Sequence, residues 1–177
     1  ALGEKEFAVA AQQVGVVADI VPQHELAGDC RLQQGAMLLD AENFADAQKA
    51  LEKFIADYTK HEKIDQATYQ LGFSKMKQDQ WPAALANFAK VTAESDWRDD
   101  ALYQLAWCQK GSGKSQNAVP HYEELLAEFP KSPLANASSL ELAELEYEAK
   151  KLNEVIRRLQ GLIVTKPKKD LLSRAQY

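Results

Sequence analysis

The stretch QATYQLG at residues 66–72 returns as DALYQLA at residues 100–106, and the chain closes with RAQY at residues 174–177. The alanine in each phrase belongs to a series of small residues that recur 37, 34, 37 and 37 residues apart. The members of the series are Cys30, Ala67, Ala101, Ser138 and Ala175. Self-similarity with a period of about 20–50 residues is typical of repeat proteins, so one repeated unit decides this fold.

A second series keeps the same period and predicts a helix. Small or slender residues are followed, four and seven positions later, by larger apolar residues. The three sets are Ala10, Ala47, Ala84, Ala118 and Val155; Val14, Leu51, Phe88, Tyr122 and Leu159; and Val17, Phe54, Val91, Leu125 and Leu162. Steps of three and four residues trace one face of an α-helix. Prolines at positions 22, 130 and 167 close three of these helices, because proline cannot continue a helix.

Each repeat therefore holds two helices joined by a turn, expected near residues 41–43, 79–80, 111–114 and 150–151. In the first helix, Gly35, Gly72, Ala106 and Ala143 are small where we expect the partner helix to approach closely. Leu71, Leu105 and Leu142 precede three of them, and Gln34 and Arg31 are departures in the first complete unit. Ser132 with Pro133 predicts a capped helix start, and Pro120 should kink its helix or move its start.

These boundaries predict one repeat domain over residues 1–177. Complete helix pairs are expected at residues 24–59, 61–95, 98–130 and 133–166. Residues 4–20 read as the second helix of a partial repeat, and residues 168–177 as the first helix of a truncated one. Neither end looks like the polar cap that closes a solenoid, so we expect a fragment of a longer array whose uncapped ends could self-associate.

The pattern of Leu–Gly in the first helix, alanine then an aromatic residue in the second, and proline at the close resembles the tetratricopeptide repeat. The period of 37 residues and the junction FPKSPLANAS at residues 129–138 are similar to repeats of bacterial cell-envelope proteins. Examples are the lipoprotein of outer-membrane β-barrel assembly and the Tol–Pal accessory protein. The resemblance implies an all-α, right-handed superhelical solenoid of antiparallel helix pairs, placed in the bacterial periplasm or cell envelope.

Composition excludes several classes of function. The formal net charge is −5 without a basic stripe, so a nucleic-acid partner is not expected. No apolar run approaches the roughly 20 residues of a membrane span. The apolar opening at residues 7–21 contains Gln12 and Gln13 and lacks a basic start, unlike a signal peptide. Cys30 and Cys108 lie two repeats apart, which predicts two buried free thiols.

No pattern favours catalysis, a metal or a cofactor. GSGKS at residues 111–115 resembles part of a phosphate-binding loop, but Cys108 stands where the first glycine is needed, and a helix precedes it. The turn between two helices is the better interpretation. His24, His61 and His121 are isolated, although the first two are equivalent and suggest a repeated surface role. Glu141, Glu144, Glu146 and Glu148 read as a solvated helix face near Lys150 and Lys151. We therefore expect a protein that is not an enzyme.

The family pattern places the concave surface on the first helices. The residues expected there to bind a partner are Tyr69, Phe73, Met76, Tyr103, Trp107, Lys110 and Tyr147. Aromatic residues and methionine are enriched at binding surfaces. The alternative is that curvature buries these rings between repeats. Both interpretations stay open for Tyr69 and Tyr103, whereas Phe73, Met76 and Trp107 favour an exposed groove.

Three hypotheses about function follow. The first is a non-catalytic scaffold that binds a peptide or protein segment in the groove, extended or helical, for which the acidic balance weakly suggests Lys or Arg. The second is a structural spacer or self-assembly element of a larger envelope protein. The third is an accessory domain of an enzyme that itself contributes no chemistry.

Overall fold

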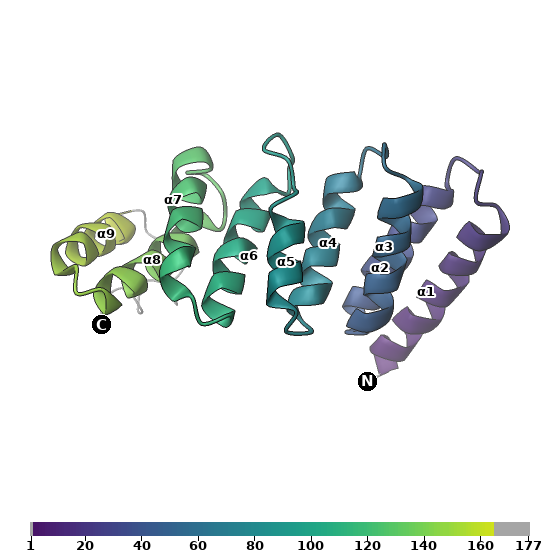
Figure 1. The fold of residues 1–177 in the computed structure, drawn as a ribbon, viewed down its shortest axis with the longest axis horizontal. Helices are drawn as coiled ribbons and strands as arrows, with labels where there is room; N and C mark the ends of the chain where they lie inside the picture. Colours follow the sequence, from purple (N-terminus) through teal and green to yellow (C-terminus); the bar gives the residue numbers. More distant parts are fainter. Residues whose placement is uncertain (1, 165–177) are drawn as a thin grey trace. The chain divides into compact units, whose positions relative to one another are not determined.

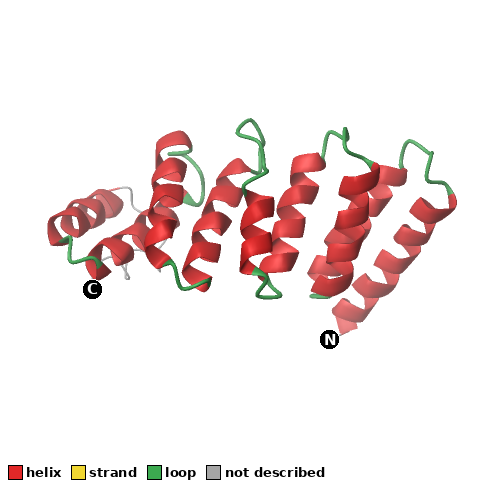
Figure 2. Ribbon diagram, viewed as in Figure 1, coloured by secondary structure: helices red, strands yellow, loops and turns green. Residues whose placement is uncertain are grey.

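The computed structural model describes residues 2–164, with side chains from residue 6 onward, and every regular element in this part of the chain is helical (Figure 2). The predicted first helix at residues 168–177 lies outside the described residues. The elements are α1 (Leu2–Ile20), α2 (Ala27–Asp40), α3 (Phe44–Asp57), α4 (Ile64–Met76), α5 (Trp81–Phe88), α6 (Arg98–Gly111), the 3-10 turn η1 (Ser115–Ala118), α7 (Val119–Glu128), α8 (Ala135–Glu148) and α9 (Leu152–Val164).

Two compact units divide the chain, residues 1–97 and residues 98–177. In the first unit, consecutive helices from α1 to α5 pack side by side, and α2 also contacts α4 (Figure 1). In the second unit, α6 packs on η1 and α7, α7 on α8, and α8 on α9. A contact between α2 and α4 is what a repeat fold requires, because each first helix then lies beside the first helix of the next repeat.

The predicted apolar stripe of the second helices forms the core. The small positions Ala47, Ala84 and Ala118 are completely buried, and so are Leu51, Phe88 and Tyr122 four residues later. The third position is buried as well, at Phe54, Val91, Leu125 and Leu162. The helix α1 follows the stripe less closely, since Val14 is half-buried and Val17 exposed.

Glycine in the first helices admits a large side chain from the second. A Cβ atom added to Gly72 would lie 2.8 Å from Cε1 of Phe88, and one added to Gly35 would lie 2.6 Å from Cδ2 of Leu51. Both distances are well below van der Waals contact. The prediction that the partner helix approaches closely at these positions is confirmed.

The four turns inside the helix pairs share one backbone feature. Each has a residue with positive φ at an equivalent place, at Glu42 (φ 53°), Asp79 (φ 57°), Gly113 (φ 76°) and Lys150 (φ 61°). The left-handed region is costly for residues with a Cβ atom and free of that cost for glycine. The GSGKS segment is thus a turn between helices, as predicted, and its glycine at 113 has a conformational reason.

Substituting Lys150→Gly is therefore expected to raise the free energy of unfolding, by about 0.5–1 kcal/mol, because glycine removes the strain of the left-handed conformation. Urea denaturation of the purified chain would measure the change. The opposite substitution at the equivalent turn, Gly113→Ala, should lower stability by about 1 kcal/mol. If both substitutions changed the free energy of unfolding by the same small amount, positive φ would not be what strains or stabilises these turns.

The turns between repeats share a side-chain hydrogen bond. In each, the backbone N–H of one residue donates to a side chain two positions earlier: Leu26 to His24 Nδ1 at 3.1 Å, Lys63 to His61 Nδ1 at 3.2 Å, Trp97 to Ser95 Oγ at 3.2 Å, and Leu134 to Ser132 Oγ at 3.0 Å. The repeated role of the two histidines is thus to stabilise a turn. The expected helix start at Ser132 was placed too early, because α8 begins at Ala135 and Ser132 caps the preceding turn instead.

Two smaller expectations concern proline and cysteine. Pro120 falls in the first turn of α7, where the missing N–H costs nothing, and the 3-10 turn η1 precedes it. The later helix start is confirmed.

Both cysteines are free, and Cys108 is buried, but Cys30 is only partly buried, which corrects the expectation for that thiol.

Candidate functional site

The seven residues predicted to bind a partner lie on three first helices. Tyr69, Phe73 and Met76 are on α4, in the first compact unit. The remaining four are in the second unit, with Tyr103, Trp107 and Lys110 on α6 and Tyr147 on α8. Within α4 and α6 the spacing of three or four residues places each group on one side of its helix.

On α4, the aromatic side chains are partly buried. The ring of Tyr69 lies 5.5 Å from that of Phe88 and 5.0 Å from that of Trp97, between centroids. Phe73 and Met76 are half-buried, and the ammonium group of Lys77 lies 5.2 Å from the centroid of Phe73. Tyr69 thus contributes to packing while part of its surface remains accessible, and Phe73 offers a ring with a cation beside it.

Sequence reasoning missed Trp97, which together with Tyr69, Phe73, Met76 and Lys77 makes the surface called the α4 surface below. Trp97 immediately precedes α6 and belongs to the first unit, where it packs against Tyr69. The equivalent positions in the other repeats hold Leu26, Lys63 and Leu134, none of which is aromatic. A search for periodic residues cannot find a residue that occurs in one repeat only.

On α6, one large aromatic side chain is exposed. The side chain of Trp107 is 44% exposed, and its ring lies 6.3 Å from that of Tyr103. Tyr103 is half-buried against the ring of Tyr122 at 5.8 Å. The ammonium group of Lys110 lies 5.6 Å from the centroid of Trp107 and forms an ion pair with Glu141 of α8. Together Tyr103, Trp107 and Lys110 make a surface of two rings and one cation, called the α6 surface below.

Tyr147 lies near the end of α8 and is 65% exposed. It borders a hollow of about 650 Å³ lined by α8 and α9, together with the apolar side chains of Leu140, Val155 and Leu159. Glu144 and Glu148 add carboxylates to this rim. The hollow therefore combines an apolar floor with an acidic edge.

The four glutamates of α8 do not form the solvated face that the sequence suggested. Glu141 and Glu146 are buried, and each pairs with a cation: Lys110 in the first case and Arg158 in the second. Glu144 and Glu148 alone are exposed. A lysine 31 residues away and an arginine 12 residues away supply the charges that make burial tolerable, and neither lies near enough in sequence to be matched by pattern.

The thiol of Cys108 is buried, whereas that of Cys30 is partly accessible. Burial raises the pKa of the Cys108 thiol to about 12, so it stays protonated and unreactive at neutral pH.

Among the described residues, no cluster of histidine, cysteine, aspartate and glutamate is arranged to hold a metal ion. Over the same residues, no helix has both the length and the apolar character to cross a bilayer.

Comparisons with known proteins give both a family and a fold. The model of the family described as outer membrane lipoprotein matches residues 1–100. The model described as tetratricopeptide repeat matches residues 100–132. No curated protein matches the chain.

Solved structures of repeat proteins match the chain as a whole. A crystal structure of MamA is 22% identical, with a TM-score of 0.70 over 86% of this chain and 85% of that chain. A structure of nearly identical TPR-like repeats from Podosopora anserina is 18% identical, with a TM-score of 0.72 over 94% and 89%. MamA from Desulfovibrio magneticus RS-1 is 14% identical, with a TM-score of 0.67 over 91% and 97%. The predicted resemblance to tetratricopeptide repeats is confirmed, and these likenesses establish the fold alone.

Proposed function

Because the chain belongs to the outer membrane lipoprotein family, we propose that it is a scaffold of the bacterial cell envelope that binds a protein segment on its first helices. Tetratricopeptide repeats typically serve as non-enzymatic scaffolds for protein–protein interaction. The family itself is associated with the outer membrane. What is proposed beyond this is the location of the binding surface and the chemistry of the segment.

The exposed ring of Trp107 carries the proposal. Large aromatic side chains are usually at least mostly covered in a folded chain, and tryptophan is the residue type most enriched among those that dominate binding energy. Trp107 is 44% exposed although it lies between the half-buried Tyr103 and the paired Lys110. Its neighbours hold the ring in place, so a partner that covers it loses little side-chain entropy.

The α4 surface supports the same interpretation in the first unit. Phe73 and Met76 remain partly accessible beside the cation of Lys77. Each of these two surfaces thus presents rings next to one lysine. A partner segment with an apolar or aromatic side chain would suit either surface, whereas the exposed Glu144 and Glu148 beside Tyr147 would suit a segment with Lys or Arg.

Accessibility of the Trp107 ring is the first quantity to measure. In a variant with Trp81→Phe and Trp97→Phe, the fluorescence of Trp107 should be quenched strongly by acrylamide, because its ring faces solvent. A peptide that binds the α6 surface should then protect the ring from the quencher. Emission that is blue-shifted and resists quenching without any peptide would remove the best residue of the proposal.

Loss of the ring should then weaken binding of any peptide selected on the chain, for example by phage display. Trp107→Ala is expected to cost about 2 kcal/mol or more, roughly 30-fold in Kd by calorimetry. Leu26→Ala is the matched control, because Leu26 is an apolar side chain of similar exposure in the turn before α2 and belongs to none of the proposed surfaces. A peptide whose affinity falls with Leu26→Ala and is unchanged by Trp107→Ala would refute the proposed location.

A second candidate function is self-assembly, which exposed apolar side chains at both ends of the described region favour. These are Val9, Val16, Val17 and Ile20 on α1, and Leu152, Ile156, Ile163 and Val164 on α9. Exposed apolar patches of this kind commonly mark interaction sites. Association that grows with protein concentration in sedimentation velocity would favour this function over the binding of a peptide in a 1:1 complex.

A further inference from the structure

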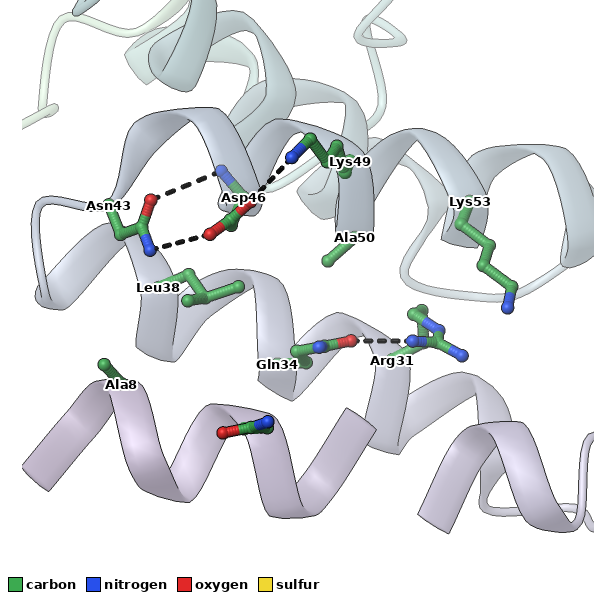
Figure 3. Close-up of a pocket in the computed structure, with 10 residues that line it drawn as sticks. Ala8, Arg31, Gln34, Leu38, Asn43, Asp46, Lys49, Ala50 and Lys53 are labelled. Atoms are coloured by element: carbon green, nitrogen blue, oxygen red, sulfur yellow. Dashed lines mark hydrogen bonds and ion pairs between the residues drawn. The ribbon is translucent and has the colours of Figure 1, made fainter. Parts of the chain in front are cut away.

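A polar cluster replaces the expected apolar contacts beside α2, the first helix of the first complete helix pair. In the other repeats, leucine occupies the core position before the small residue of the first helix, but α2 has Gln34 there, with Arg31 one turn earlier. Both side chains line a pocket of about 520 Å³ between α1, α2 and α3 (Figure 3). The pocket lies on different helices from the α4 surface, so it is a separate feature of the first unit.

The charges of this cluster do not cancel. Arg31 donates from Nη2 to Oδ1 of Asp19, and Lys53 donates from Nζ to the same oxygen at 2.6 Å. Two cations thus share one carboxylate, whose pKa is lowered by its hydrogen bonds with Lys53 and Arg31. Lys49 on the same rim is already neutralised by Asp46, at 2.8 Å. The group of Arg31, Lys53 and Asp19 therefore carries one positive charge in excess, whereas the chain as a whole is acidic.

Burial makes this excess charge significant. Arg31 is only 5% exposed, and its Nη1 donates to Oε1 of Gln34 at 2.7 Å. Its Nε is also buried and has no hydrogen-bond partner among the residues that the structure describes. A buried guanidinium group is stabilised by negative charge more strongly than an exposed one, because water screens it less.

The helix α1 is shaped to leave room for this cluster. Gly15 faces Gln34, and a Cβ atom added to Gly15 would collide with the side-chain amide of Gln34. The amide therefore depends on a glycine that another helix contributes. Figure 3 shows Arg31 and Lys53 at one end of the pocket, with Gln34 beside Arg31 and with Leu38 and Ala8 towards the other end.

We propose that this pocket binds an acidic side chain of a partner protein, with its carboxylate beside Arg31 and Lys53 and its aliphatic part towards Ala50. The ligand carboxylate supplies the negative charge that Asp19 alone does not. Because Asp19 is half exposed and holds both cations, it also competes with the ligand. The site is independent of the aromatic surfaces, so it stands or falls separately from the proposed function.

The test is a titration of the ¹⁵N-labelled chain, followed by NMR, with acetyl-Ala-Glu-Ala-amide as probe. Saturable shifts are expected for the Nε–H signal of Arg31 and the side-chain amide of Gln34. The isosteric acetyl-Ala-Gln-Ala-amide should produce no such shifts, because it lacks the charge. Both peptides are blocked at their ends, so the glutamate side chain is the sole carboxylate added.

Three variants separate a site from diffuse attraction. Lys53→Gln should weaken binding of the glutamate peptide about threefold to fivefold, as expected for a partly exposed ion pair. Asp19→Asn should strengthen it by a similar factor, because both cations are released. Lys49→Gln is the matched control and should change little, since Lys49 is neutralised by Asp46.

Three outcomes would overturn the proposal. The first is the absence of saturable shifts in both the wild-type chain and Asp19→Asn, with otherwise unchanged spectra that show the fold intact. The second is an equal response to the glutamate and glutamine peptides. The third is an equal loss with Lys49→Gln and Lys53→Gln, which would show attraction to the surface in general.

Discussion

Phe88→Ala is expected to lower the free energy of unfolding of the first unit by about 3–5 kcal/mol. The ring is completely buried and lies where a Cβ atom at position 72 would be, and its centroid is 5.5 Å from that of the tilted Tyr69 ring. Its removal leaves a cavity that the helix pair cannot close, because α4 already approaches α5 at Gly72. The loss is a large fraction of the stability of an ordinary domain.

Fluorescence during urea unfolding would measure this loss in a background with Trp107→Phe. Trp81 and Trp97 then remain as probes, and both belong to the first unit. Phe7→Ala provides the control, because Phe7 is 45% exposed and should cost under about 1 kcal/mol. If Phe88→Ala stays within 1 kcal/mol of the parent, the close contact of α4 and α5 is not what stabilises this unit.

Arg158→Ala is expected to lower the stability of the second unit by about 3 kcal/mol. The guanidinium group donates to both oxygens of Glu146, from Nε at 2.9 Å and from Nη2 at 2.6 Å. Glu146 is buried on α8. Removing the arginine leaves a carboxylate that has lost both water and its partner, and this cost exceeds the modest net value of the pair itself.

A double substitution separates the cost of leaving Glu146 unpaired from the net contribution of the ion pair to stability. Replacing Glu146 with leucine and Arg158 with methionine should recover most of the lost stability, since no buried charge is then left unpaired. Urea unfolding followed by Trp107 in a background with Trp81→Phe and Trp97→Phe would report the second unit. The adjacent Arg157→Ala is the matched control and should change stability by under about 0.5 kcal/mol, because Arg157 is exposed. A double variant no more stable than Arg158→Ala would show that the pair itself carries the stabilisation.

Much of the architecture follows from the order of residues alone. The repeated stripe of Ala47, Leu51 and Phe54 predicts which face of a helix is buried, and the structure buries all three completely. The turn positions also follow from the period, and the positive φ values fall within them. These features depend on contacts between residues close in sequence or exactly one repeat apart, so a period of 34 or 37 residues records them.

The candidate sites follow from sequence less completely. The repeat pattern selects Trp107 for the exposed side of α6, but Trp97 and its contact with Tyr69 occur in one repeat alone and leave no periodic signal. The polar positions of Arg31 and Gln34 stand out as departures from the pattern. Their meaning depends on Asp19 and Lys53, which no local rule connects to them.

The sequence by itself determined the helix pairs, their period, the buried stripe and the kind of repeat, because each of these depends on short-range spacing repeated along the chain. The tertiary structure alone decided which charges are buried, as with Glu141 and Glu146, and which cations share a carboxylate, as with Arg31 and Lys53 at Asp19. The physical reason is that burial and ion pairing are properties of neighbours in space, and these neighbours come from different helices whose separation in sequence carries no fixed rule.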